Sequence, residues 1–198
     1  MLLIPEIETV VILVPRTATT STINAVKERY PRAIQLYRHM EADGVPEGYR
    51  NWACVGVVRA PLDRLWSLFK FMRDFSGWRS PEYGTVMRAS AQMSFDTWLT
   101  SNDIVFATPH DFSRPGHLQA RSSVLHPLPE NRKSQFIYLR PDLGTEVYRY
   151  DELSRFADRL GISLLSSNES GGSAIAADIS TSTLNKLIRL MPWDFNHG

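Results

Sequence analysis

Blocks of apolar and polar residues alternate along the chain and predict strands and helices in succession. Residues 9–14 are β-branched and apolar on both faces, which is typical of a strand inside a sheet. A helix is predicted at about 20–30, and it should end before Pro31. AIQLYRHM (33–40) is a candidate for a second strand, and WACVGVV (52–58) predicts a third. This succession favours an α/β fold.

After the third strand, the apolar residues change to helical spacing. Pro61 suits the first turn of a helix, because a helix makes no use of an N–H there. The apolar positions that follow at this spacing are Leu62, Leu65, Trp66, Phe69 and Met72. They predict a helix with one apolar face packed against the sheet.

The second half of the chain contains fewer regular segments. SFDTWLTS (94–101) predicts a short helix with Ser94 as its cap. The remaining predicted elements are strands at QFIYL (135–139) and EVYRY (146–150), a helix over 151–162 closed near Gly161, and a helix over 182–191 stopped by Pro192. Together these elements predict a single domain, residues 1–198, built as a three-layer α/β sandwich with a mainly parallel central sheet.

Composition narrows the function classes. The chain has 198 residues and a net charge of +1, so we expect a globular protein with no nucleic-acid partner. Its one cysteine, Cys54, lies in an apolar run, which predicts a buried and inert thiol. The apolar N-terminal stretch is interrupted and too short to span a membrane, and it lacks the features of a signal peptide. We therefore expect a soluble, cytoplasmic protein with no membrane partner. The pattern leaves the oligomeric state open.

The turn after the first strand, within VILVPRTATTSTI (11–23), has the outline of a phosphate-binding loop without its usual Gly-Lys pair. Residues 16–21 would wrap backbone N–H groups around an anion at a helix N-terminus. Arg16 would supply the positive charge, and hydroxyl groups would add donors from Thr17, Thr19, Thr20 and Ser21. The alternative is a helix cap followed by a surface arginine.

The turn after the third strand carries a cation where a triphosphatase usually carries an aspartate. Arg59 ends this strand, and Arg64 and Ser67 are three positions apart on the predicted helix that follows. These three side chains could converge on a second anion without a metal ion. The alternative for Arg64 is an ion pair on the surface.

These two turns resemble motifs of the sulfotransferase superfamily. PRTATTS is similar to its 5′-phosphosulfate loop, and VVRAPLDRLWSLF is similar to its 3′-phosphate motif. The carbohydrate-type branch is further resembled by GHLQARSSVL (116–125), VYRYDELSRFADRLGI (147–162) and PWDF (192–195). The resemblance implies a phosphate-loop-like α/β fold. It also implies 3′-phosphoadenosine 5′-phosphosulfate (PAPS) as cosubstrate, no metal, and a small soluble protein of bacterial or phage type.

The resemblance also assigns roles to residues. Arg16 would replace the lysine that contacts the oxygen bridging phosphate and sulfonate, and Ala18 would replace a glycine. The implied PAPS-binding residues are Arg16, Thr17, Ala18, Thr19, Thr20, Ser21, Arg59, Arg64, Ser67 and Tyr150. Tyr150 corresponds to a position near the adenine, and half-buried packing is the alternative for it.

The acceptor requires a general base, for which a neutral histidine suits pH 7. His39 follows the second strand candidate and should open onto the same edge of the sheet as the two turns. The alternative for His39 is a solvent-exposed histidine at the strand end, and Glu41 and His117 are the other candidates for the base. Residues 73–133 are expected to supply the loops that contact a small-molecule or carbohydrate acceptor. Two alternative functions remain. The chain could bind the nucleotide without catalysis, or it could be a small phosphate-loop kinase.

Overall fold

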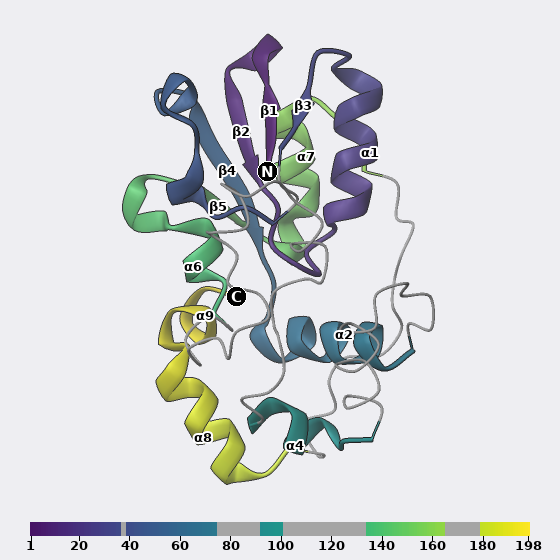
Figure 1. Ribbon diagram of the computed structural model, residues 1–198, viewed down its shortest axis with the longest axis vertical. Coiled ribbons are helices and arrows are strands. Elements are labelled where there is room, and N and C mark those ends of the chain that lie inside the picture. Colours follow the sequence, from purple (N-terminus) through teal and green to yellow (C-terminus); the bar gives the residue numbers. More distant parts are fainter. Residues whose placement is uncertain (37–38, 75–91, 101–133, 165–178) are drawn as a thin grey trace.

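The computed structural model describes residues 1–36, 39–74, 92–100, 134–164 and 179–198 (Figure 1). The strands are β1 (Leu2–Ile4), β2 (Thr9–Ile12), β3 (Ile34–Gln35), β4 (Ala53–Val58) and β5 (Glu146–Arg149). The α-helices are α1 (Thr19–Arg29), α2 (Pro61–Asp74), α4 (Phe95–Thr100), α6 (Phe136–Leu139), α7 (Leu153–Leu160), α8 (Thr181–Leu190) and α9 (Pro192–His197). The 3-10 helices are η1 (Pro5–Ile7), η2 (Ala42–Gly44), η3 (Glu47–Tyr49), η6 (Pro141–Leu143) and η7 (Tyr150–Glu152). The predicted α/β class is confirmed.

Within the described residues, the strands form one open sheet in the order β3-β1-β2-β4-β5. β2, β4 and β5 are parallel, whereas β1 is antiparallel to both β2 and β3. The sheet is therefore mixed, and the prediction of a mainly parallel sheet holds only for its β2-β4-β5 part. The physical reason is the short connection from β1 to β2 through η1 and Glu8 (φ 44°), because so few residues can join only antiparallel strands.

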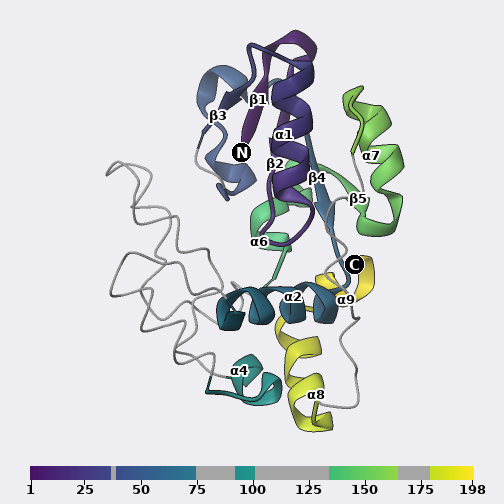
Figure 2. The same ribbon diagram turned by 90° about the vertical axis from the view of Figure 1, so that its right-hand side faces the viewer.

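The sheet is buried on both faces, as the apolar character of residues 9–14 predicts. Val11 and Leu13 pack in the core that α1 and α7 cover. Val10 and Ile12 pack in the core on the other face, against η2 and α6. Helices α7 and α6 lie on opposite sides of the strands (Figure 2), so both faces of the sheet are covered.

A second group of helices lies beyond the carboxyl ends of β2 and β4 (Figure 1). α2, α4 and α8 share their own apolar cluster, in which Leu65, Phe69 and Trp98 are buried. The predicted apolar face of α2 is therefore present, but the prediction that it packs against the sheet is wrong. Because α2 crosses below the strand ends, its apolar side faces α4 and α8 instead. The side chain of Met72 lies outside the described residues.

Most predicted element ends are confirmed by their caps. The Thr97 N–H donates to Ser94 Oγ at 3.1 Å before α4. Gly161 closes α7 with a left-handed backbone at φ 60°. Pro192 ends α8 as predicted, and it also begins α9, which the pattern did not predict.

QFIYL was predicted as a strand because its residues are aromatic and β-branched, and this prediction is wrong. Phe136–Leu139 form helix α6, with Tyr138 and Leu139 buried on the sheet. Gly56 of β4 leaves room for this helix, since a Cβ at that position would collide with the Leu139 side chain. Tertiary packing therefore overrides the local preference for a strand. The strand predicted over 33–40 is reduced to Ile34–Gln35, and residues 37–38 lie outside the described part.

Other predictions concern residues that the structure does not describe. The expected acceptor loops over 73–133 fall mostly in 75–91 and 101–133, and His117 lies in the second of these ranges.

Cys54 is half-buried rather than buried, and burial raises the pKa of its thiol. Among the helices of the described residues, none has both the length and the apolar character needed to cross a bilayer.

Candidate anion-binding site

The turn between β2 and α1 is held by two threonine hydroxyl groups. Thr17 Oγ1 and Thr19 Oγ1 both donate to the carbonyl oxygen of Val14, at 3.0 Å and 2.8 Å. Both threonines are buried. The sequence predicted that these hydroxyl hydrogens would bind an anion, but here they hold the loop closed. Anion contacts from Thr17 and Thr19 would therefore come from their backbone N–H groups.

Two residues of this turn have left-handed backbone conformations. Arg16 has φ 69° and Ala18, the N-cap of α1, has φ 59°. This conformation costs a residue with a Cβ roughly 1–2 kcal/mol, so the turn stores strain. Helix α1 begins at this turn, and the partial positive charge of the helix end favours an anion there. Thr20 is exposed and Ser21 half-buried at this helix start.

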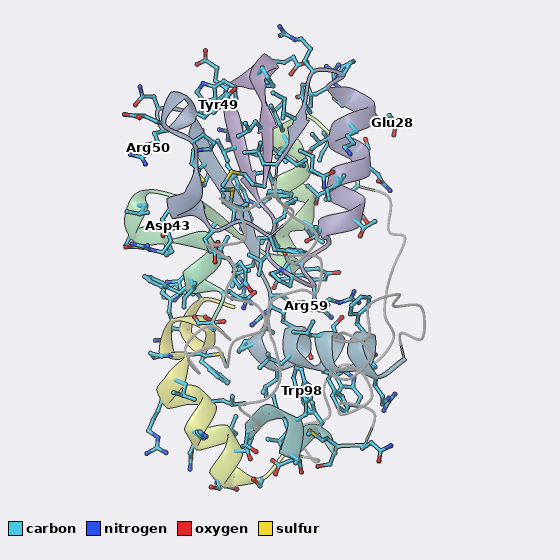
Figure 3. All side chains as sticks on the ribbon, in the orientation of Figure 1. Glu28, Asp43, Tyr49, Arg50, Arg59 and Trp98 are labelled. Atoms are coloured by element: carbon cyan, nitrogen blue, oxygen red, sulfur yellow. The ribbon has the colours of Figure 1, made fainter. Side chains whose placement is uncertain are left out.

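The turn after β4 brings the second group of predicted residues to the first. Arg16 Nε donates to Ser67 Oγ of α2 at 3.0 Å, and Arg59 Nη1 donates to the Arg16 carbonyl oxygen at 3.4 Å. Because β2 and β4 are parallel neighbours, their carboxyl ends meet at one edge of the sheet. Figure 3 shows Arg59 at this edge, between the sheet and α2. The structure therefore brings Arg16, Arg59 and Ser67 together.

Aromatic rings lie next to both half-buried cations. The Arg59 guanidinium lies 4.6 Å from the centre of the Tyr150 ring, and that of Arg16 lies 5.0 Å from the Phe71 ring. Tyr150 begins η7 directly after β5, so a third strand end joins the site. Its ring also packs against the core under α7. Such contacts hold a guanidinium in place while it keeps its charge.

Arg64 lies inside the protein rather than on its surface. Its side chain is 1% exposed, which excludes the surface ion pair that was the alternative for it. Burial lowers the pKa of its guanidinium, while the carboxylate of Asp194 has the opposite effect because it favours the charged form. Arg64 therefore belongs to a buried charged group beside the site, as a neighbour of Asp194.

Two residues of this group, Gln135 and Asp194, were not among the predicted site residues. Both are fully buried. The Asp194 carboxylate accepts from the Gln135 N–H at 2.8 Å and from the Ser134 hydroxyl group. The only sequence signal was the PWDF segment, which the resemblance singled out without giving its aspartate a role. Gln135 was hidden inside the strand predicted at QFIYL.

His39 lies at the same edge of the sheet, next to the end of β2. It is 6% exposed, and its Nδ1 lies 2.6 Å from the carbonyl oxygen of Leu13. Since a carbonyl only accepts, Nδ1 carries the hydrogen of this bond. In the neutral ring, Nε2 is then the nitrogen that can accept a proton. Glu41, the alternative base, follows His39 by two residues and is also buried.

The described site is thus a set of cations and a histidine at the carboxyl ends of parallel strands of an α/β sheet, where proteins of this class bind ligands. No family model, no curated protein and no solved structure matches this chain.

Proposed function

We propose that this protein is a sulfotransferase that moves a sulfuryl group from PAPS to a hydroxyl or amine acceptor. The proposal includes a phosphate-loop-like sulfotransferase fold. One observation carries it: Arg16, Arg59 and Ser67, taken from two separate motifs, meet at one sheet edge through contacts of 3.0 Å and 3.4 Å. A ligand with phosphate groups at both the 5′ and the 3′ position is the kind of anion that two such adjacent turns would bind.

The donor set fits this ligand. The backbone N–H groups at the start of α1, together with Arg16, would bind the 5′-phosphosulfate. Arg59 and Ser67 would bind the 3′-phosphate, with the Arg59 guanidinium held against Tyr150. A sulfuryl group carries less negative charge than a phosphoryl group. These cations would therefore be sufficient to stabilise the charge that develops during its transfer, without a metal ion.

In the reaction, His39 Nε2 would take the proton from the acceptor as its oxygen or nitrogen bonds to sulfur. The bond from sulfur to the bridging oxygen then breaks, and Arg16 stabilises the charge that develops on this leaving phosphate oxygen. A general base contributes a factor of roughly 10²–10⁴, and each aimed donor lowers the barrier by about 3–4 kcal/mol. A sugar hydroxyl is the acceptor that the carbohydrate-type resemblance favours.

The first experiment measures thermal stabilisation by adenosine 3′,5′-bisphosphate, the product nucleotide, without magnesium. At a concentration 100 times Kd, a ligand stabilises the folded state by about 2.7 kcal/mol, which raises Tm by several degrees. Arg59→Ala and Ser67→Ala should abolish this shift. Arg189→Ala, which removes an exposed arginine in the last turn of α8, is the matched control and should keep it. An unchanged Tm for the wild type at millimolar nucleotide would contradict the proposal.

A protein that binds the nucleotide without catalysis is the second candidate. The feature that favours it is the turn after β2, where Arg16 and Ala18 stand in place of the lysine and glycine of the motif that the turn resembles. Transfer of labelled sulfate from PAPS to a panel of hydroxyl and amine acceptors separates the two. Transfer that is lost in His39→Ala supports the enzyme, and nucleotide binding without any transfer supports the binding protein.

A further inference from the structure

The backbone of Arg59 is held by a side chain from a distant part of the chain. Its N–H donates to Gln135 Oε1 at 2.9 Å, and its carbonyl oxygen accepts from Gln135 Nε2 at 2.7 Å. Arg59 lies one residue beyond the last paired residue of β4, which is Val58 opposite Arg149. The amide of Gln135 therefore acts as a one-residue extension of the sheet, and it supplies the partners that another strand would otherwise supply.

Gln135 is in turn held by Asp194 of α9. The second N–H of its side-chain amide donates to Asp194 Oδ2 at 3.2 Å, and its backbone N–H donates to the same oxygen at 2.8 Å. The amide thus uses both of its hydrogens and its oxygen, and it has one orientation that satisfies all of them. The end of α9 also lies against Arg59, because a Cβ on Gly198 would lie 2.7 Å from the Arg59 carbonyl oxygen.

We propose that Gln135 and Asp194 are positioning residues that fix the guanidinium of Arg59 in the anion site. Fixing both the N–H and the carbonyl group of Arg59 sets the direction in which its side chain leaves the backbone. From that point the guanidinium reaches the Arg16 carbonyl oxygen and the Tyr150 ring. The inference rests on the proposed function only in taking Arg59 as an anion ligand. Neither Gln135 nor Asp194 would touch the ligand.

The orientation of Arg59 can be measured without any ligand. The Nε–Hε resonance of Arg59 in the ¹⁵N spectrum is assigned by its loss in Arg59→Lys. Gln135→Met keeps the length of the side chain and removes its hydrogen-bonding groups, so the Arg59 resonance should shift and its hydrogen exchange should become at least about tenfold faster. Gln35→Met removes the half-buried amide of β3 and is the matched control, with no effect on Arg59 expected.

Binding gives the second readout. Gln135→Met should weaken the affinity for adenosine 3′,5′-bisphosphate by about 10- to 100-fold, because a misplaced charged ligand loses most of its contribution. In an Arg59→Ala background, whose weak residual binding is measured at higher nucleotide concentration, the same change should alter the affinity by less than about twofold, since its effect passes through Arg59. A residue with a merely structural role would instead have the same effect in both backgrounds.

Each outcome decides one of the two proposals. An unchanged Arg59 resonance in folded Gln135→Met overturns the positioning role. If Gln135→Met does not fold, Gln135→Asn is used, since it keeps the amide but is too short to bond both Arg59 and Asp194, and the same expectations apply. A wild-type protein that does not bind the nucleotide contradicts the proposed function, while the resonance of Arg59 still tests the role of Gln135.

Discussion

Two turns carry the cations of the candidate site, and different parts of the chain hold them. The Arg16 turn is closed by hydroxyl groups that bond to Val14, three and five residues away in the sequence. The Arg59 turn is closed by the amide of Gln135, 76 residues away, and through it by Asp194. The shape of the first turn is therefore determined by residues within the turn itself. The second acquires its shape only when Gln135 and Asp194, from distant parts of the chain, have come together beside it.

The two turns also differ in their energetic cost: the first has a strained backbone, and the second lies over buried charged side chains. The Arg16 turn has two left-handed residues without glycine, and so it is strained. The Arg59 turn has no such residue among those described, but beneath it lies a buried group of polar and charged side chains that includes Arg64 and Asp194. We expect the first turn to tolerate changes that relax its backbone, and the second to be sensitive to the loss of one buried partner.

The largest effect is expected from Asp194→Ala. This change removes the acceptor for the Gln135 N–H and the Ser134 hydroxyl group, and it leaves the buried guanidinium of Arg64 without its neighbouring carboxylate. Breaking such a buried charged group typically costs about 3–5 kcal/mol of unfolding free energy. Urea unfolding followed by tryptophan fluorescence measures it.

Asp158→Ala, on the exposed side of α7, is the matched control and should change the unfolding free energy by less than about 0.5 kcal/mol. A loss below about 1 kcal/mol in Asp194→Ala would mean that the Arg59 turn does not depend on these distant contacts. The contrast between the two turns would then be lost.

The same contrast explains what could be predicted from the sequence. β2, α1 and β4 were predicted because their apolar periodicity and their end signals lie within the elements themselves. The pairing of the Arg16 and Arg59 turns followed from the rule that parallel neighbours end at one edge, and the contact between Arg16 and Ser67 agrees with it. Local patterns and general rules of topology were sufficient for this part.

The features that the sequence did not reveal depend on partners far along the chain. Short apolar segments such as QFIYL have no periodicity of their own, and α6 packs over Gly56, where a Cβ would collide with the Leu139 side chain. β1 was missed because Pro5 and Glu8 interrupt the N-terminal pattern, although they form the connection that makes the strand antiparallel. Gln135 gave no local signal and the PWDF segment gave Asp194 no role, since the role of a buried polar residue is recognised only once its partners are known.

An intermediate effect is expected from Thr19→Val in the Arg16 turn. Valine has nearly the same shape as threonine but cannot donate to the carbonyl oxygen of Val14. Losing one buried hydrogen bond costs about 1–3 kcal/mol when an acceptor is left unsatisfied, and Thr17 still bonds to the same oxygen, so we expect the lower end of this range. Chemical denaturation measures the loss.

Thr181→Val is the control for Thr19→Val, because Thr181 is exposed in the first turn of α8 and should change stability by less than about 0.5 kcal/mol. The double change Thr17→Val, Thr19→Val should cost more than the sum of the two single changes, since only then does Val14 lose both hydroxyl donors. Simple additivity would show that the two hydroxyl groups do not share one acceptor in solution.

The smallest effect, and the one with the opposite sign, is expected from Ala18→Gly. Ala18 has φ 59°, a conformation that glycine adopts without strain, so the folded state gains up to about 1–2 kcal/mol. The greater freedom of glycine in the unfolded chain offsets about 0.4–1 kcal/mol of this gain. We therefore expect a net stabilisation of up to about 1 kcal/mol, measured as a rise in the denaturation midpoint.

Ala25→Gly in the middle of α1 is the matched control, and it should be destabilising by about 0.5–1 kcal/mol. If both changes were destabilising, the strain assigned to the Arg16 turn would be absent, and both turns would then depend on packing alone.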